Sequence, residues 1–459
     1  MKKTILLLLV LMSFGRVFAQ AIPNTLSAAE KVYGLSKFWQ EVNYNFIYLD
    51  KVDRKMWENA FKEYIVKVQE TKNDYEYYRE LQKFCALLKD GHTNIYMPQN
   101  LQSFQMNTMF GDYRLFLKNV AGKVIVERVN PSKKDEIPVG SEIVEVNGMT
   151  TADYMNKHVK PYISSSTDYV LQDYAASNLL RGLENDTYQL KFITPSQTVK
   201  NLTITHKKTA EMDVFPAFKE DSLFVMKWLD NGVAYIALNS FADSKINKQF
   251  EEKLPELYKA KGLIIDLRQN GGGNTGVGTG ILQYLTNDKE LHHSRYRTRE
   301  HRASFKAWGI YTTPKDTVNN AWNTQCYLYN NDQKYYDFEY KPDAINLKAK
   351  RLVVPTAVLI GHNTASAAED FLISADNQKH FTKIGERSFG STGQPYLFQM
   401  PGGGNARVCT KKDTYPDGRE FVGVGIIPDI EVIPTLKDYI DNKDTVLEKA
   451  ISYLSNKLK

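Results

Sequence analysis

Apolar and polar residues alternate with different periods in three regions of the chain. In residues 26–88, apolar and aromatic residues recur every three or four positions, which predicts amphipathic helices. In residues 113–206, short apolar runs between turn residues predict strands, with one helix near residues 167–180. From residue 223 onwards, apolar strands alternate with helical segments. The predicted fold is therefore multidomain α/β, with a helical N-terminal domain, a β-rich module and an α/β core.

The third region contains the same local pattern twice: a buried strand, a tight loop and the start of a helix. The first unit has expected strands at residues 233–238 and 263–267, a helix at 248–258, a glycine-rich loop at 268–276 and a helix to about residue 285. In the second unit, an apolar run at 352–360 leads into a helix that begins near Ser366. Polar side chains at such a junction are candidates for chemistry.

Ser366 is the first candidate catalytic residue. Free backbone N–H groups and the positive end of the helix dipole at its junction favour developing negative charge, which suits an acyl-transfer nucleophile. The tetrapeptide from Ser366 to Glu369 is also a capping box, in which each side chain bonds the backbone of the other residue. Taken alone, the tetrapeptide allows both interpretations.

His92 is the second candidate. It lies in the turn Asp-Gly-His-Thr, between the predicted helices and a short strand. Such a corner can hold a side chain rigidly while it reaches a cleft, and a neutral imidazole can act as a base near pH 7. A lone histidine is nevertheless more often structural.

The glycine-rich loop fits the dinucleotide-binding pattern GxGxxG through Gly271, Gly273 and Gly276. That fingerprint requires a second strand ending in an acidic residue about twenty positions later, and the basic segment at 291–299 does not provide one. We expect the glycines instead to let backbone N–H groups approach a substrate oxygen.

Two later segments are less distinctive. Residues 288–350 are polar and rich in Tyr and Asn, which indicates a lid or surface insertion, and the histidines within it lack zinc-ligand spacing. We expect no metal and no cofactor. Residues 419–432 read as a strand on which Glu420 alternates with Val422 and Val424, and a C-terminal helix is expected at 444–458.

The N-terminal sequence and the composition indicate the cellular compartment of the protein. Residues 1–19 have the basic start, short apolar run and small residues of a cleaved signal peptide, so we expect a periplasmic or extracellular protein without a membrane span. Removing them lowers the formal charge from +6 to +3, and the interspersed charges argue against nucleic-acid binding. The chain has three cysteines, Cys85, Cys326 and Cys409, which are distant from one another in the sequence. We expect them to be buried free thiols or to form at most one bridge.

Residues 124–148 resemble part of a PDZ domain, with two strands and an Asn-Gly turn. PDZ domains bind peptide ends by adding a strand to a sheet edge. The glycine-rich loop that caps a bound carboxylate is not recognisable here, so a small β-rich spacer is an equal alternative.

Four motifs in order resemble the carboxyl-terminal processing, or tail-specific, serine proteases: Gly262-Leu-Ile-Ile-Asp-Leu-Arg-Gln-Asn-Gly-Gly-Gly, Asn363-Thr-Ala-Ser-Ala-Ala-Glu, Ile384-Gly-Glu-Arg-Ser-Phe-Gly-Ser-Thr-Gly-Gln and Gly423-Val-Gly-Ile-Ile-Pro-Asp. The resemblance implies a tail-specific protease core. The expected organisation is a signal peptide at 1–19, a helical domain at 26–92, a PDZ-like module at 103–208, a catalytic core at 222–436 with the insertion at 288–350, and a helix at 437–459.

The chain departs from the Ser-Lys branch of that family, in which a lysine base follows the nucleophile by 25 residues. That position is Ser391 here, and no lysine lies in residues 388–397. The sequence is more similar to the branch typified by the tricorn protease core, which uses a histidine and a glutamate. His92 matches that histidine, with Gly91 where the tricorn type has a supporting serine, and Glu420 is the best match for the glutamate.

The resemblance implies an exported serine endopeptidase that cleaves proteins or peptides near their carboxyl termini. Ser366 would form the acyl-enzyme, His92 would be its general base and Glu420 would orient the imidazole. The oxyanion hole would comprise the N–H of Ala367 and one N–H from the loop around Gly271 and Gly272. The sequence does not indicate an oligomeric state.

Three alternatives stay open from the sequence. The chain could be a binding protein that keeps the protease fold without catalysis, or an esterase-like hydrolase that uses the same serine. A Ser-Lys mechanism that uses Lys383 or another base is a further variant.

Overall fold

The computed structural model describes residues 21–218 and 222–459 of the chain. The expected signal peptide lies outside these residues. Within the described part, no helix is long and apolar enough to cross a membrane.

The N-terminal domain consists of three helices, as the periodicity predicts: α1 (Ala28–Asn45), α2 (Arg54–Glu70) and α3 (Asp74–Ala86). Each begins after a polar residue whose side chain accepts a backbone N–H of the first turn, namely Ser27, Asp53 and Asn73. Aromatic residues fill the space between the helices. The Phe84 ring stacks on Trp57 with centroids 4.3 Å apart, and both side chains are fully buried.

A β-rich module follows, built on a seven-stranded sheet in the order β10-β9-β6-β5-β4-β3 with β7 paired to β6. Its strands are β3 (Met109–Phe110), β4 (Tyr113–Val120), β5 (Lys123–Val129), β6 (Glu142–Val146), β7 (Met149–Thr150), β9 (Thr187–Ile193) and β10 (Val199–Thr205). Its helices are α5 (Thr151–Tyr154) and α6 (Asp168–Ser177). A short helix, α4 (Gln99–Gln102), and a two-stranded sheet of β2 (Gln105–Met106) and β8 (Gly182–Leu183) complete this region. The predicted strands and the predicted helix are confirmed.

The α/β core is a six-stranded sheet in the order β11-β12-β13-β18-β19-β23. Its strands are β11 (Phe224–Leu229), β12 (Val233–Leu238), β13 (Gly262–Asp266), β18 (Thr356–Ile360), β19 (Phe381–Gly385) and β23 (Ile430–Glu431), all parallel except β11. Its helices are α7 (Lys245–Leu257), α8 (Thr275–Leu282), α11 (Ala367–Ser374), α12 (Leu436–Ile440) and α13 (Thr445–Lys457). Residues of α7, α8 and α11 pack on one face and residues of α13 on the other. Because both faces are covered, the central strands are continuous apolar runs.

The expected strand at residues 419–432 is wrong over most of its length, since only β23 forms there. Gly423 and Gly425 have φ of 86° and 79°, a left-handed conformation that an extended strand does not contain. Their N–H groups bond Gly390 and Phe421 instead of a neighbouring strand. Glu420 consequently lies in an exposed loop and not on a strand face.

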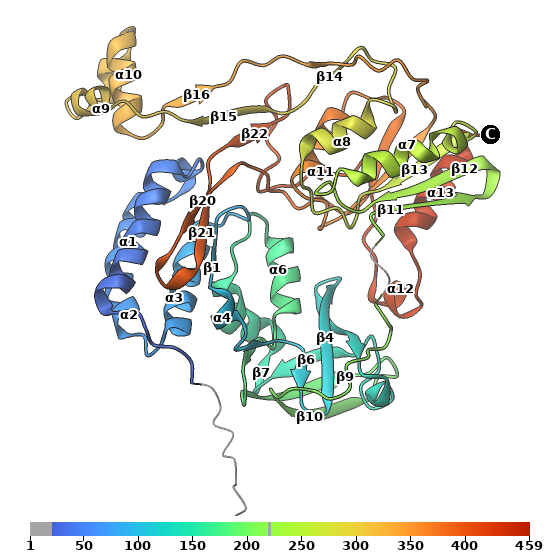
Figure 1. The fold of residues 1–459 in the computed structure, drawn as a ribbon, viewed down its shortest axis with the longest axis horizontal. Helices are drawn as coiled ribbons and strands as arrows, with labels where there is room; N and C mark the ends of the chain where they lie inside the picture. Colours follow the sequence, from blue (N-terminus) through green and yellow to red (C-terminus); the bar gives the residue numbers. More distant parts are fainter. Residues whose placement is uncertain (1–20, 219–221) are drawn as a thin grey trace, which may run out of the picture.

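The chain returns from the core to the N-terminal domain after β19. Strands β20 (Pro395–Gln399) and β21 (Asn405–Cys409) form a three-stranded sheet with β1 (Asn94–Tyr96), in which Ile95 pairs with Ala406. Ala406 and Val408 are buried in the same apolar cluster as the residues of α1, α2 and α3. Figure 1 shows these strands beside the three helices. This sheet places the loop at 386–394 between the core and the turn that carries His92.

The insertion extends from the core as an arm that ends in two helices (Figure 1). It contains β14 (Glu290–Leu291), β15 (Arg295–Arg299), α9 (Ala303–Gly309), α10 (Ala321–Asn330), β16 (Tyr335–Asp337) and β17 (Asp343–Ala344). β15 pairs with β16 and with β22 (Lys412–Thr414), which fastens the arm to the C-terminal part of the core. The three cysteines are buried and free, as predicted.

The N-terminal aromatic core gives a test of stability. Phe84→Ala removes a fully buried ring that packs against Trp57, Phe38 and Tyr64. We expect the free energy of unfolding to fall by about 3–5 kcal/mol in urea titration. Tyr33→Ala, whose ring is 61% exposed on α1, is the control and should change it by less than about 0.5 kcal/mol. Equal effects of the two changes would contradict the packing described for this domain.

Candidate active site

Ser366 lies where the loop after β18 enters α11, as the sequence predicts. Its backbone has φ 54° and ψ −120°, which is uncommon for a residue with a side chain and is found where the surrounding structure enforces it. The preceding residues are fastened to the glycine-rich loop, because Ala365 donates its N–H to Asn270 O at 3.0 Å. The Thr364 hydroxyl donates to Leu267 O at 2.9 Å. Ser366 itself is only half-buried.

Glu369, in the first turn of α11, is fully buried and connects this junction to a distant loop. Its Oε2 accepts the N–H of Ser366 at 3.1 Å and the N–H of Ser391 at 3.3 Å. Its Oε1 accepts the Ser388 hydroxyl at 2.5 Å and the Gly390 N–H at 2.7 Å. Burial raises the pKa of Glu369 to about 8, although all four of these hydrogen bonds act in the opposite direction. The glutamate contact expected for a capping box is present, and the same carboxyl also holds residues 388–391.

His92 is bound to the loop that Glu369 holds. Its Nδ1 lies 2.7 Å from Ser391 Oγ, while its Nε2 makes no hydrogen bond to any described residue. The turn around it is rigid, since Gly91 donates its N–H to Ser166 Oγ at 2.9 Å and Thr93 donates its hydroxyl to the buried Asp90 at 2.6 Å. The helix-to-strand corner predicted for this histidine is confirmed.

The electrostatic surroundings keep His92 neutral. Burial is the largest cause, and the positive charges of Arg407 and Lys411 add to it, so that the pKa of His92 is lowered to about 4. A neutral imidazole at physiological pH has the lone pair that a general base requires.

Glu420 does not contact His92. Its carboxylate is 47% exposed and forms ion pairs with Lys51, at 3.3 Å, and with Lys412. The hydrogen bond from Lys412 is the main cause that lowers the pKa of Glu420. The structure therefore brings His92 to Ser391 and leaves Glu420 with two lysines, while the orienting role of Glu420 stays a prediction from the sequence.

The glycine-rich loop lies directly against Ser366. A Cβ added to Gly272 would be 2.8 Å from Ser366 Cβ and 2.9 Å from the Ala367 nitrogen, so only glycine fits there. Gly272 donates its N–H to Asn270 Oδ1 at 2.9 Å. The N–H groups of Gly271 and Ala367, by contrast, make no hydrogen bond within the described part of the chain. These two N–H groups are the available donors beside the serine.

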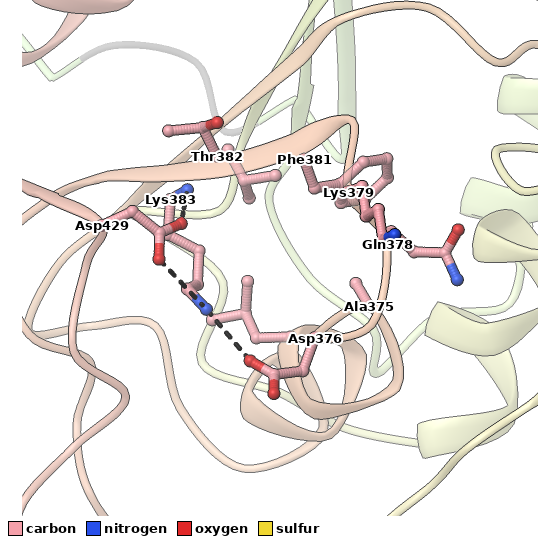
Figure 2. Close-up of a pocket in the computed structure, with 10 residues that line it drawn as sticks. Ala375, Asp376, Gln378, Lys379, Phe381, Thr382, Lys383 and Asp429 are labelled. Atoms are coloured by element: carbon pink, nitrogen blue, oxygen red, sulfur yellow. Dashed lines mark hydrogen bonds and ion pairs between the residues drawn. The ribbon is translucent and has the colours of Figure 1, made fainter.

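Lys383 lies at the other end of α11 from Ser366. Figure 2 shows its ammonium group between Asp376, at 3.2 Å, and Asp429, at 3.7 Å. The three residues line a cavity of about 250 Å³ together with Ala375 and other residues that follow the C-terminal end of α11. A lysine held by two carboxylates at this distance along the helix has no contact with the serine.

Two residues at the centre of the site were not identified as functional from the sequence. The sequence distinguishes Ser391 only as the position where the Ser-Lys branch has its lysine, and it predicts Glu369 only as a capping residue. The signal that could have identified Ser391 is that a serine stands at the position where the Ser-Lys branch has its catalytic lysine. Glu369 gives no such signal, because its contacts with residues 388–391 depend on the folded loop.

Comparison with known proteins identifies sequences and structures that are similar to this chain. Residues 232–432 match peptidase family S41. The chain is 22% identical over 369 residues to a carboxyl-terminal-processing protease of Picosynechococcus sp., covering 78% of this chain and 73% of that protein. It is 23% identical over 394 residues to the carboxy-terminal processing protease CtpB of Bacillus subtilis, covering 84% and 68%. Among solved structures, mature CPAF complexed with lactacystin superimposes with a TM-score of 0.68 at 14% identity, covering 94% and 99%, which indicates a shared fold.

The buried carboxyl of Glu369 predicts a pH dependence of stability. Its pKa is about 8 in the folded chain and near 4.5 when unfolded, so the folded chain binds an additional proton between these values. The free energy of unfolding should therefore fall as the pH rises from 4.5 to 8. Glu369→Gln should remove this contribution in urea titrations across the range. Glu63→Gln, an exposed glutamate on α2, is the control, and parallel curves for wild type and Glu369→Gln would refute the assignment.

Proposed function

We propose that the chain is a carboxyl-terminal processing serine peptidase of family S41, with Ser366 as its nucleophile and His92 as its general base. The observation that carries the proposal is the link through Glu369. One carboxyl oxygen accepts the N–H groups of both Ser366 and Ser391, and Ser391 binds His92. The nucleophile and the base are thus positioned by one buried group.

In the proposed reaction, His92 keeps its proton on Nδ1 and donates a hydrogen bond from it to Ser391 Oγ, which leaves the Nε2 lone pair free. Nε2 accepts the hydroxyl proton of Ser366 as Oγ attacks the peptide carbonyl. The N–H groups of Ala367 and Gly271 stabilise the oxyanion, each worth roughly 3 kcal/mol in the transition state. The imidazolium then protonates the leaving amine as the C–N bond breaks, and water hydrolyses the acyl-enzyme by the same route.

We assign to Ser391 the role of orienting the imidazole ring of His92. A Cβ at Gly91 would lie 3.2 Å from Ser391 Oγ, so the hydroxyl occupies the space that a side chain preceding the histidine would use. The Nδ1 contact fixes the ring and its tautomer, which is the role of the third member in a serine protease triad. Glu420 is the competing assignment, and its pairing with Lys51 and Lys412 speaks against it.

We further propose that the substrates are exported proteins or peptides, cleaved near their carboxyl termini. The names of the relatives support this substrate class, and the sequence of residues 1–19 supports export. Neither a metal nor a cofactor is required by the proposed chemistry.

Fluorophosphonate labelling tests the nucleophile and the base. Intact-mass measurement should find one adduct on the wild-type chain and none on Ser366→Ala, while His92→Ala should slow labelling by about 10²-fold or more because the general base is lost. Ser103→Ala and His158→Ala change exposed residues of the same types and should label normally. A folded wild-type chain that is not labelled would support the binding-protein alternative, and full labelling of His92→Ala would exclude it as the base.

The pH dependence of peptide hydrolysis tests the orienting group. Because the pKa of His92 is about 4, kcat/KM should decline only below about pH 4. Ser391→Ala should lower kcat about ten-fold, equivalent to about 1.4 kcal/mol, and move the acid limb of the profile. Glu420→Gln should leave both nearly unchanged, and the reverse pattern would assign the orientation to Glu420.

A further inference from the structure

Arg407 lies directly beside the proposed general base. It is on β21, where it pairs with Asn94 of β1. Its Nε donates to Asn94 Oδ1 at 2.8 Å, and its Nη2 donates to the carbonyl of Gly91, the residue before His92, at 3.3 Å. Two hydrogen bonds thus hold the guanidinium at a fixed place next to the catalytic turn.

This guanidinium has no carboxylate partner within 4.0 Å among residues 21–218 and 222–459. By contrast, Arg268 and Arg419 each form ion pairs with two aspartates. The other cation that influences His92 is Lys411, which is neutralised by Asp413 at 2.9 Å. The charge of Arg407 acts on Asp90 without a direct contact, and Asp90 is a buried residue already bonded by Thr93 and Ser166.

Arg407 is accessible from one side. It is only half-buried, and its Nη1 makes no hydrogen bond to a described residue. Leu397, its partner on β20, is 63% exposed, and Tyr96, whose ring centroid lies 5.6 Å from the guanidinium, is 41% exposed. Directly paired residues share one face of a sheet. The face beside His92 therefore presents a positive charge flanked by apolar surface.

We propose that Arg407 binds a carboxylate of the peptide substrate and makes this chain prefer substrates with a carboxylate close to the cleaved bond. This inference rests on the proposed function of Ser366 and His92. A guanidinium can bind a carboxylate through two parallel hydrogen bonds, and it does so more strongly in partly buried surroundings than in water. The carboxylate comes either from the free end of a chain or from an aspartate or glutamate side chain.

A carboxylate bound to Arg407 should also speed the reaction, because it compensates the positive charge beside His92. The imidazolium of His92 forms in the transition state next to the positive charge of Arg407, and this repulsion opposes the proton transfer. A bound carboxylate cancels the charge of Arg407 and lowers that cost. A matching substrate should therefore gain in kcat as well as in KM.

Matched peptides test the proposal. A peptide found by mass spectrometry to be cleaved in a casein digest is synthesised with a free carboxyl terminus, with a terminal amide, and as amides with Glu or Gln near the cleaved bond. The wild type should show kcat/KM at least ten-fold higher for one carboxylate form than for its neutral counterpart. Preference for the free terminus identifies a chain end as the source, and preference for the Glu amide identifies a side chain.

The variants decide whether Arg407 is responsible. Arg407→Gln should reduce the ratio of carboxylate to neutral peptide to about one, and Arg407→Lys should give an intermediate ratio because it keeps the charge without the paired donors. Arg302→Gln removes an exposed arginine from the arm and should keep the wild-type ratio. A wild-type ratio near one, or the same ratio in Arg407→Gln, would overturn the proposal.

A binding measurement separates this proposal from that of the catalytic serine. Fluorescence anisotropy of the same peptides on Ser366→Ala should show tighter binding of the carboxylate form, and the double change with Arg407→Gln should abolish the difference. This result would stand even if the wild type were neither labelled nor active, in which case only the catalytic assignment would fail. Equal or undetectable binding of both forms by Ser366→Ala would overturn the role of Arg407.

Discussion

The site depends on one buried carboxyl group. Glu369 receives two backbone N–H groups on one oxygen and a hydroxyl and a third N–H on the other, and three of these four donors come from the loop at 388–391. A buried group of this kind is stable only when its hydrogen bonds are satisfied. The loop therefore has one position relative to α11, and that position places Ser391 where His92 can bind it.

The rest of the fold determines the position of His92. His92 is more than 270 residues from Ser366 in the sequence, and the sheet of β1, β21 and β20 brings the two regions together. The buried side of this sheet joins the aromatic core of the N-terminal helices, while its opposite side carries Arg407. Packing that stabilises the N-terminal domain thus also fixes the position of the proposed base.

The sequence allowed the elements with strong periodicity to be predicted, including the three N-terminal helices and strands such as β12. Prediction from the sequence failed where tertiary contacts determine the local conformation. Residues 419–432 alternate like a strand, but Gly423 and Gly425 take positive φ and bond other loops. The junction at Ser366 was predictable from a local pattern, whereas the contact of Ser391 with His92 joins residues 299 positions apart and leaves no local pattern. Glu369 looked like a helix cap because that contact is local, and its contacts with residues 388–391 are not.

A crystal structure of the fluorophosphonate adduct would test most directly whether Ser366 and His92 are the nucleophile and the base. We predict phosphorus bonded to Ser366 Oγ and a phosphoryl oxygen within hydrogen-bonding distance of the Ala367 and Gly271 N–H groups. We also predict His92 Nε2 facing the adduct, with Nδ1 still bonded to Ser391. An adduct on another residue would contradict the assignment of Ser366, and an imidazole bound to Glu420 with Ser391 turned away would contradict the role of Ser391.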